Sequence, residues 1–500
     1  MTKRVPASWA RATLGGITVQ KVDQRAPVSE SSYIDISSID RDKKEIGELR
    51  LVDTDSAPTR ARQWVKRGDV LVSMTRPNLN AVAMVPEQLN GAVASTGFDV
   101  LRALSVLPSW IFNRVRSREF IADVCQNLQG VVYPAVRPRD IRAHVLPIPP
   151  LPEQHRIVEA IESYLTRLDD AVASLERVQR NLERYRASVL KAAVEGRLVP
   201  TEAELARQEG RDYEPASELL RRITATRQAR WESAELQRLR AQEREPAGHS
   251  WRSRYREPAS PATSETVALP DGWCWASLDQ LTYFTVDYRG KTPPIAESGV
   301  RTISAANVKA GGLVFDRPRH VSQDTYREWA VRGLPRPGDL LVTTEAPVGE
   351  AALYPDQGTY LLTRRVIALQ TVGVDNRYIA YCFSGDVVRK HIAANNRGTT
   401  VPRILKPALL STTVPLPPAA EQRRIVESVE SLLSRVDGQR AATSFASRHC
   451  DRLRQSILKW AFEGKLVEQD PDDEPAAVLL ERIKAEREAA PKPGPKRKKT

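Results

Sequence analysis

One long stretch of this sequence occurs twice, and the duplication constrains the fold more than any other feature. Residues 146–165 read LPIPPLPEQHRIVEAIESYL, and residues 414–433 read VPLPPAAEQRRIVESVESLL, so the second copy begins 268 residues after the first. The match continues downstream, where LKAAVEGRLV at residues 190–199 corresponds to LKWAFEGKLV at residues 458–467. Solenoid repeats recur about every 20–50 residues, so a period this long indicates a duplicated half-molecule. We therefore predict two related units with internal pseudo-two-fold symmetry.

Length and charge narrow the class of protein. A chain of 500 residues, of which 41% are hydrophobic, predicts roughly two to four folded domains. The formal net charge of +13 favours a polyanionic partner, with nucleic acid ahead of a membrane surface. The sequence contains no apolar run of roughly 18 residues and no signal-peptide core near its start. We expect a cytoplasmic protein that does not span a membrane.

The sequence offers few groups for metal or cofactor chemistry. Its four cysteines, at positions 125, 274, 382 and 450, form no CxxC pair, so we interpret them as reduced thiols and not as zinc ligands. The histidines lie apart from cysteine or carboxylate pairs at metal-ligand spacing. The GxxxxGKS/T and GxGxxG motifs are missing, as is the Asn-Pro-Pro-Tyr/Phe stretch that amino-methyltransferases use. We expect no metal, ATPase motor or methyl-donor site in this chain.

The sequence predicts two globular domains of mixed α and β structure. In the first, GDVLVSM at residues 68–74 predicts a buried strand that is entered through a Gly-Asp turn. In the second, GDLLVTT at residues 338–344 repeats this pattern. Further downstream, Gly130 and Pro134 correspond to Gly398 and Pro402. We predict one fold for both regions, with loops that have diverged.

A long helix is predicted after each globular region. In the first helix, the a positions of a heptad seam are Ile161, Leu168, Leu175, Leu182 and Val189, and the d positions are Tyr164, Ala171, Val178 and Tyr185. This pattern predicts a coiled-coil helix of roughly 65 Å from residue 153 to residue 195. In the second copy, the a positions include Val429, Val436 and Ile457, and the d positions include Leu432 and Leu453. This second seam is weaker, so we predict antiparallel pairing with the first helix.

With these motifs in order, the chain resembles the DNA-specificity subunit of a type I restriction–modification system. The resemblance rests on PLPEQHRIV with PLPPAAEQRRIV, EGRLV with EGKLV, LPDGWCW (269–275), DYRGKTPP (287–294) and EPAAVLLERI (474–483). It implies target-recognition domains at 1–150 and 269–418, conserved helical spacers at 151–242 and 419–489, a linker at 243–268 and a basic disordered tail at 490–500. The fold class is then α+β, with two similar globular domains separated by two long antiparallel coiled-coil helices.

The resemblance also implies a function. Each recognition domain would read one half of a bipartite, asymmetric sequence in double-stranded DNA. The helices would set the spacer and dock two methylation subunits, which nuclease and translocase subunits would join. The chain would bind no cofactor, whereas the partner subunits would use S-adenosylmethionine, ATP and Mg²⁺. The complex would be an adenine-DNA methyltransferase and an ATP-dependent endodeoxyribonuclease that defends the cytoplasm of a bacterium or archaeon against foreign DNA.

Candidate DNA-binding residues are the Arg, Lys and Asn side chains of turns beside predicted strands, because Arg suits guanine edges, Asn suits adenine edges, and cations suit phosphates. In the first domain these are Arg60, Arg62, Lys66, Arg67, Arg76, Asn78 and Asn80. In the second they are Arg289, Lys291, Arg364, Arg365, Asn395, Asn396, Arg397 and Arg403. The first domain has no GKTPP-like element, so the two domains need not contact DNA through the same positions. We interpret Trp64, beside the first cluster, as a core residue.

Half-sites one helical turn apart lie about 34–36 Å from centre to centre. Because a helix of roughly 65 Å exceeds that length, we expect an unspecified spacer of about 5–8 base pairs between the two half-sites.

The residues alone leave three hypotheses for the function of the chain. The first is a non-catalytic DNA-reading subunit, and the second is a scaffold whose globular domains bind protein. A scaffold would lack a steep salt dependence of DNA binding. The third is a nuclease, which would need a carboxylate cluster. Glu153 and Glu421 are the obvious acids, but they occupy first-turn helix positions, where we expect them to accept free helix N–H groups.

Overall fold

The chain divides into two compact units, each built around its own hydrophobic core. The computed structural model describes residues 5–127, 134–243, 248, 250–261, 268–288, 292–309, 312–398 and 400–489. Unit 1 comprises Met1–Arg177 and Thr443–Thr500, and unit 2 comprises Val178–Ala442. Arg289, Lys291 and the predicted tail at 490–500 lie outside the described residues.

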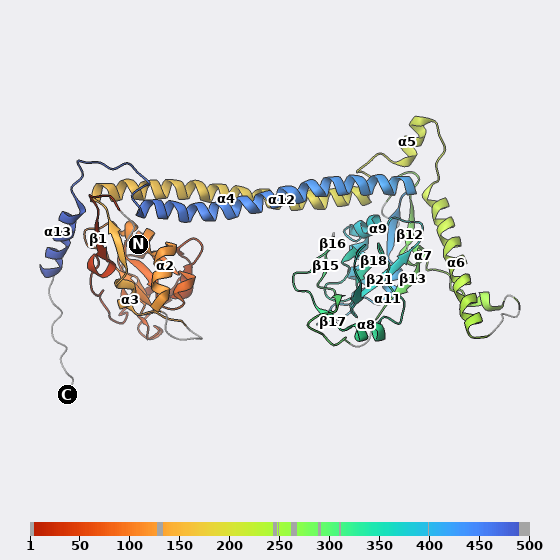
Figure 1. Cartoon of the computed structure of the whole chain (residues 1–500), viewed down its shortest axis with the longest axis horizontal. Coiled ribbons are helices and arrows are strands. Elements are labelled where there is room, and N and C mark those ends of the chain that lie inside the picture. Colours follow the sequence, from red (N-terminus) through yellow and green to blue (C-terminus); the bar gives the residue numbers. More distant parts are fainter. Residues whose placement is uncertain are drawn as a thin grey trace. The chain divides into compact units, whose positions relative to one another are not determined.

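Two long helices, α4 (Leu151–Val194) and α12 (Ala419–Phe462), each contribute to both units. Both are followed by a glycine with a left-handed backbone, Gly196 and Gly464, each with φ of 68°. A glycine adopts this conformation at no steric cost, so it ends the helix. The predicted pair of long helices is therefore confirmed (Figure 1).

The helices pair in antiparallel fashion within each unit. In unit 1, Ile157 and Ile161 near the start of α4 share one core with Ile457 and Phe462 near the end of α12. In unit 2, the end of α4 packs against the start of α12, with Val189, Ala193, Ile425 and Val429 in one core. Stability of these helices therefore comes mainly from packing of an apolar face and not from helix propensity.

The predicted seam is only partly right. Ile161, Leu182, Val189, Val429, Val436 and Ile457 are buried, and Leu168, Leu175, Leu432 and Leu453 are half-buried. Tyr164 and Val178, however, are 44% and 42% exposed, so they do not belong to the buried seam. Leu165 and Leu168 pack toward the core in place of Tyr164. Residues four apart lie on one helical face, and this face also rests on the globular domain of unit 1.

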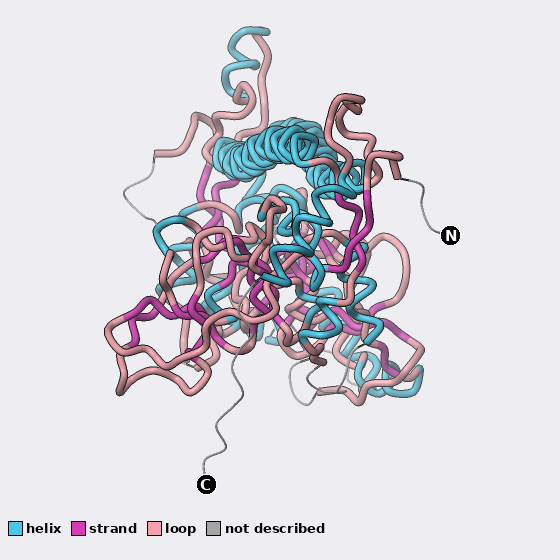
Figure 2. Tube along the Cα trace, turned by 90° about the vertical axis from the view of Figure 1, so that its left-hand side faces the viewer, coloured by secondary structure: helices cyan, strands magenta, loops and turns pink. Residues whose placement is uncertain are grey.

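In its described residues, the globular part of unit 1 contains three short α-helices and eleven short strands. The strands are β1 (Ala10–Thr13), β2 (Ser31–Ile34), β3 (Ile39–Asp40), β4 (Glu45–Ile46), β5 (Arg50–Val52), β6 (Ala61–Trp64), β7 (Val70–Ser73), β8 (Val82–Met84), β9 (Val93–Ser95), β10 (Phe98–Leu101) and β11 (Val145–Ile148). The helices are α1 (Pro108–Val115), α2 (Arg118–Val124) and α3 (Pro138–Arg142), and α13 (Ala476–Ala489) packs on β1. Loops and turns, drawn in pink in Figure 2, connect the helices and strands of the chain.

Unit 2 repeats this plan with an added helical segment. Its strands are β12 (Cys274–Ser277), β13 (Thr282–Val286), β14 (Val300–Ile303), β15 (Val308–Lys309), β16 (Gly312–Leu313), β17 (His320–Val321), β18 (Leu340–Thr343), β19 (Ala351–Leu353), β20 (Tyr360–Leu362), β21 (Val366–Thr371) and β22 (Thr413–Leu416). Its helices are α5 (Glu202–Glu209), α6 (Ala216–Ala241), α7 (Leu278–Leu281), α8 (Gln323–Trp329), α9 (Asn376–Cys382), α10 (Asp386–Ala394) and α11 (Lys406–Leu410).

The sheets of the two units correspond. The strand order β10-β7-β8 of unit 1 recurs in unit 2 as β21-β18-β19, and the first and last strands of each globular domain pair as β1-β11 and β12-β22. A parallel pair also recurs, with Tyr33 opposite Val93 in unit 1 and Arg301 opposite Tyr360 in unit 2. The prediction of one mixed α and β fold in both regions is therefore confirmed.

The start of each long helix is joined to its own globular domain by a buried glutamate and glutamine. The Glu153 carboxylate accepts hydrogen bonds from Trp9 Nε1 at 2.9 Å and from Gln469 Nε2 at 2.6 Å. The next side chain, Gln154, accepts from the Leu107 N–H at 3.0 Å and donates to the Pro149 carbonyl at 2.9 Å. The expectation that Glu153 accepts N–H groups of its own helix is therefore wrong.

The same arrangement recurs at the second helix. Glu421 accepts from Trp273 Nε1 and from the Glu202 N–H, both at 2.9 Å. Gln422 accepts from the Asp375 N–H at 3.0 Å and donates to the Pro417 carbonyl at 2.9 Å. These contacts are a physical reason for the repeated Glu-Gln pair, because each side chain satisfies buried polar groups of the domain beside it.

The predicted linker is not structureless where it is described. Residues Ser250–Arg254 form a short 3₁₀ helix, and Trp251 is buried. The Trp251 ring stacks on Trp231 of α6, with ring centroids 6.1 Å apart and planes at 20°. Aromatic packing therefore holds part of this segment on α6.

Candidate functional site

One crossing point of the chain is built in the same way in both units. In unit 1 it lies just after β7, where the Met74 N–H donates to the Gly97 carbonyl at 3.0 Å and the Met74 carbonyl accepts from the Val136 N–H at 2.9 Å. The next residue, Thr75, forms a bridge with Ala135. We call this the strand-end crossing of unit 1, comprising residues 74–76, 96–97 and 134–136.

Unit 2 forms the matching crossing after β18, from residues 344–346, 364–365 and 402–404. Here the Thr344 N–H donates to the Arg365 carbonyl and the Thr344 carbonyl accepts from the Ile404 N–H, both at 2.9 Å. Glu345 forms a bridge with Arg403. Because the backbone contacts match one for one, the two crossings can be compared position by position.

The described residues predicted to bind DNA in the second domain gather at this crossing. Arg364 and Arg365 lead into it, and Arg397 and Arg403 exchange backbone hydrogen bonds of 2.8 and 2.9 Å. Asn396, Arg397, Arg403 and Arg364 are exposed. Asn395 differs, because its side-chain amide donates to the His391 carbonyl at the end of its own helix. The others present cationic and amide groups of the kind that contact phosphates and base edges.

The residues predicted for the first domain do not form one cluster. Arg60 lies at the crossing of unit 1, because its carbonyl accepts a hydrogen bond from the Thr96 N–H at 2.9 Å. Arg76 is itself part of that crossing, directly after Thr75 in the sequence. Asn78 is exposed on the 3₁₀ turn Pro77–Leu79. Lys66 and Arg67 instead lie at the opposite end of β7, where Arg67 pairs with Glu87 at 2.5 Å. Arg60 precedes β6, whereas Lys66 and Arg67 precede β7, so proximity in sequence does not bring these cations together.

Two of the remaining residues near β6 are held locally. Arg62 is exposed on β6, and its Nε donates to the Thr59 carbonyl at 2.9 Å. Trp64 is half-buried, and its Nε1 donates to the Arg25 carbonyl at 3.1 Å. The Arg25 guanidinium also lies 4.9 Å from the Trp64 ring centroid. Trp64 therefore packs against the chain at the edge of the core.

Asn80 has a structural role that involves a lysine missed in the sequence. Asn80 is buried with φ of 47°, and its carbonyl accepts from Lys44 Nζ at 2.7 Å. Lys44 itself has φ of 61°, and burial lowers the pKa of its ammonium group. Arg76, at the other end of the Pro77–Leu79 turn, also has a left-handed backbone, with φ of 49°. Strained residues of this kind tend to cluster at functional sites.

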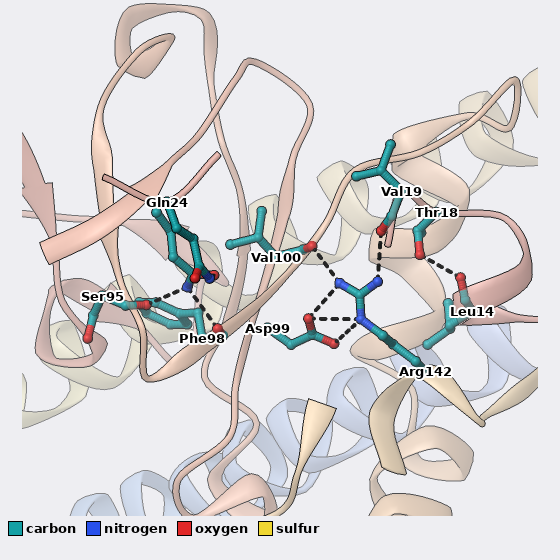
Figure 3. A network of polar contacts seen from close by, with 10 residues as sticks. Leu14, Thr18, Val19, Gln24, Ser95, Phe98, Asp99, Val100 and Arg142 are labelled. Carbon is teal, nitrogen blue, oxygen red and sulfur yellow. Dashed lines mark hydrogen bonds and ion pairs between the residues drawn. The ribbon is translucent and has the colours of Figure 1, made fainter. Parts of the chain in front are cut away.

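A buried ion pair lies next to the crossing of unit 1. The Arg142 guanidinium contacts Asp99 Oδ1 at 2.7 Å and donates to the Val19 carbonyl at 2.7 Å and to the Val100 carbonyl at 3.1 Å (Figure 3). Burial raises the pKa of the Asp99 carboxyl, and Arg142 opposes that rise. The pair joins α3 to β10 close to Gly97.

A concavity of about 360 Å³ adjoins the crossing of unit 2. Its wall includes Ala346, Gly349, Phe383, Asn396 and Pro402. The matching position in unit 1 to Ala346 is Arg76, since the Arg76 N–H donates to Pro134 and the Ala346 N–H donates to Pro402. The two crossings therefore share a backbone but differ in surface shape.

Nothing in the described part of the chain resembles a metal centre, since no three His, Cys, Asp or Glu side chains gather with suitable geometry there. Burial raises the pKa of the Cys274 thiol to about 11 and that of the Cys382 thiol to about 12, so both stay protonated near neutral pH. A protonated thiol is a poor nucleophile and a poor metal ligand. Among the described residues, no helix is long and apolar enough to cross a bilayer.

Comparison with known proteins points to one family. Residues 334–441, which include the crossing of unit 2, match the type I restriction modification DNA specificity domain. The chain is 25% identical over 500 residues to the type I restriction enzyme EcoKI specificity subunit of Escherichia coli K12, covering 97% of this chain and 95% of that protein. It is also 25% identical over 384 residues to the EcoBI specificity subunit of E. coli, covering 74% of this chain and 70% of that protein.

Solved structures share the fold. A chain from a study of complex assembly and conformational transition of the type I R-M system aligns with a TM-score of 0.68 and 24% identity, covering 92% of this chain and 99% of that chain. The HsdS subunit of Thermoanaerobacter tengcongensis aligns with a TM-score of 0.54 and 24% identity, covering 93% and 99%. Both likenesses support the arrangement of two globular domains with long helices.

Proposed function

We propose that this chain, which belongs to the family of type I restriction–modification DNA specificity subunits, reads one half of a bipartite DNA sequence with each of its two globular domains. One observation carries the proposal. The strand-end crossing is duplicated with the same backbone contacts, while its side chains differ between the units at every matching position except Pro134 and Pro402. A shared backbone frame with different Arg, Thr and Glu side chains suits two readers of unlike base sequences.

The chain itself is non-catalytic, as is its family. The methylation and cleavage activities belong to the partner subunits in this proposal, and so do S-adenosylmethionine, ATP and Mg²⁺. The assembled complex would act as an adenine-DNA methyltransferase and an ATP-dependent endodeoxyribonuclease in the cytoplasm. DNA and the other restriction–modification subunits are the partners, with two methylation subunits per chain.

The long helices are the proposed docking surface for the methylation subunits. Large apolar side chains on these helices that do not enter the seam include Tyr164, Val178, Tyr185, Phe445 and Trp460, each of them 42–59% exposed. Aromatic side chains of this kind are common anchors of protein interfaces. Tyr164 and Val178, wrongly placed in the seam, thus keep their predicted docking role as part of this proposal.

The first test is the methylation pattern of DNA from cells that co-express this chain with its partner methylation subunit. We expect a modified motif of two short, unlike halves around a fixed spacer. Cells that lack the chain but contain the partner are the matched control, and their DNA should lack the motif. Unmodified DNA from a complex that demonstrably assembles would instead favour a scaffold role.

A further inference from the structure

The two strand-end crossings place different side chains at three matching positions. In unit 1 the residues are Thr75, Gly97 and Ala135, and in unit 2 they are Glu345, Arg365 and Arg403. The match follows from the backbone, because Gly97 and Arg365 accept equivalent hydrogen bonds and the other positions form equivalent bridges. At these three positions unit 2 thus has one acidic and two basic side chains, whereas unit 1 has no charged side chain.

Glu345 is held rigidly at the centre of this group. Its Oε2 lies 3.2 Å from Arg365 Nε, and its side chain is 27% exposed. Its backbone is fixed on both sides, since Thr344 is hydrogen-bonded to Arg365 and Ile404, and Ala346 donates to Pro402. A side chain placed in this way on a fixed strand end has the rigidity that base readout requires.

A carboxylate at this place needs an explanation. If the surrounding cations contact DNA, the Glu345 charge approaches phosphates of the same sign, which weakens binding. The ion pair with Arg365 reduces this cost, yet a carboxylate can accept about four hydrogen bonds and Arg365 uses only part of this capacity. Base edges in the major groove supply the missing donors, and cytosine N4 is the donor that Asp and Glu side chains accept.

We propose that Glu345 is a specificity-determining residue of the second domain and accepts a hydrogen bond from the N4 amino group of a cytosine in the half-site that this domain reads. Arg365 is a positioning residue that holds the carboxylate. The inference rests on the proposed DNA-reading function. It also predicts that the first domain reads its own half-site differently, because Thr75 occupies the matching position.

The test uses the complex of the full chain with its methylation subunit and a set of duplexes in which each base pair of the second half-site is replaced in turn. Glu345→Gln should lower the preference for C·G over the other pairs by roughly ten- to a hundredfold at one position, because one good base contact is worth that factor. A Gln amide also suits adenine, so A·T should gain at that position. Glu345→Ala should lose the preference without gaining a new one.

Glu328→Gln is the matched control, since Glu328 is an exposed acid on α8 of the same unit. It removes the same charge and should leave both half-sites unchanged. If Glu345→Gln raised the affinity for every duplex by the same factor, unrelated DNA included, the carboxylate would only repel phosphate. That result would overturn the proposal. Unchanged discrimination would overturn it too. Failure of the proposed function would look different, because the wild-type complex itself would then modify no bipartite motif.

Discussion

Trp9 donates its indole N–H to Glu153 at 2.9 Å, and this buried hydrogen bond joins the opening segment of a globular domain to the first turn of its long helix. Trp273 and Glu421 form the same bond in the other unit, also at 2.9 Å. A reader of two half-sites needs each domain fixed on its helix, because looseness there would blur the distance between the halves. The repeated Glu-Gln pair thus links the duplicated sequence to the proposed geometry of recognition.

Glu153→Ala should destabilise unit 1 by about 1–3 kcal/mol, because it leaves the buried Trp9 indole N–H without an acceptor and removes the contact with the exposed Gln469 amide. Trp9→Phe removes the donor from the same bond. A double-mutant cycle with both changes should therefore give a clear coupling energy in chemical unfolding of the chain. The exposed Glu159 of α4 is a suitable control, and its change to Ala should cost little. Additive effects of Glu153→Ala and Trp9→Phe would contradict the assigned contact.

The two glutamates should also leave a pH signature. Burial raises the pKa of Glu153 and of Glu421 in the folded chain above the usual value of 4.5. A raised folded pKa gives a stabilising contribution that is fully present below the unfolded pKa and is lost as the pH rises through the folded pKa. Between about pH 4.5 and those raised pKa values, the wild type should therefore lose stability relative to the Glu153→Gln, Glu421→Gln double variant. Parallel unfolding curves for the two proteins across this range would rule the effect out.

The sequence predicted the helices that a periodic apolar pattern specifies. It did not predict contacts between turns that lie far apart in the sequence. The heptads around Ile161 and the weaker seam around Val429 predicted the two long helices, because a repeated apolar spacing indicates a helix with a paired face. The hydrogen bonds of Trp9 to Glu153 and of Trp273 to Glu421 were not predicted, because they depend on packing across more than a hundred residues. Tyr164 was misplaced because the buried face also follows the globular domain, which a heptad pattern does not encode.

The candidate site shows the same division. Arg397 and Arg403 were found because loop cations are visible in a sequence, whereas Glu345 was overlooked because an acid is not expected on a DNA-reading surface. Lys44 was missed for another reason. Its contact with Asn80 arises from a hairpin tip with a left-handed residue, and no local motif marks that approach.

Lys44→Met should weaken discrimination in the first half-site only. The Lys44 ammonium holds the Asn80 carbonyl at the end of the turn that carries Arg76 and Asn78, so its loss should loosen that turn. We expect a stability loss of about 1.5–3 kcal/mol, which is usual for a hydrogen bond to a charged group. Lys43→Met is the matched control, because Lys43 is exposed beside it. Competition binding with duplexes altered in one half-site or the other would separate this local effect from a general loss of affinity.

Exchange of residues 1–150 for the corresponding domain of a relative should change one half of the recognised sequence. The exchanged segment carries the whole strand-end crossing of unit 1 and leaves that of unit 2 untouched. Methylation motifs of the parent and the chimaera are the measurement. A change in both halves would mean that the two domains do not read independently.

The lengths of α4 and α12 should set the spacer. The variant has seven residues inserted into each helix, after Arg177 in α4 and before Thr443 in α12. These are the positions where the two helices pass from one unit to the other. Seven residues add about 10.5 Å and nearly two full turns, so the faces of both helices are kept. At about 3.4 Å per base pair the spacer should lengthen by about three base pairs, with both half-sites unchanged. Insertion of five residues is the control, because it rotates the two ends by roughly 140° and should abolish methylation at every spacing. A spacer that stays constant after the seven-residue insertion would show that the helices do not measure the DNA.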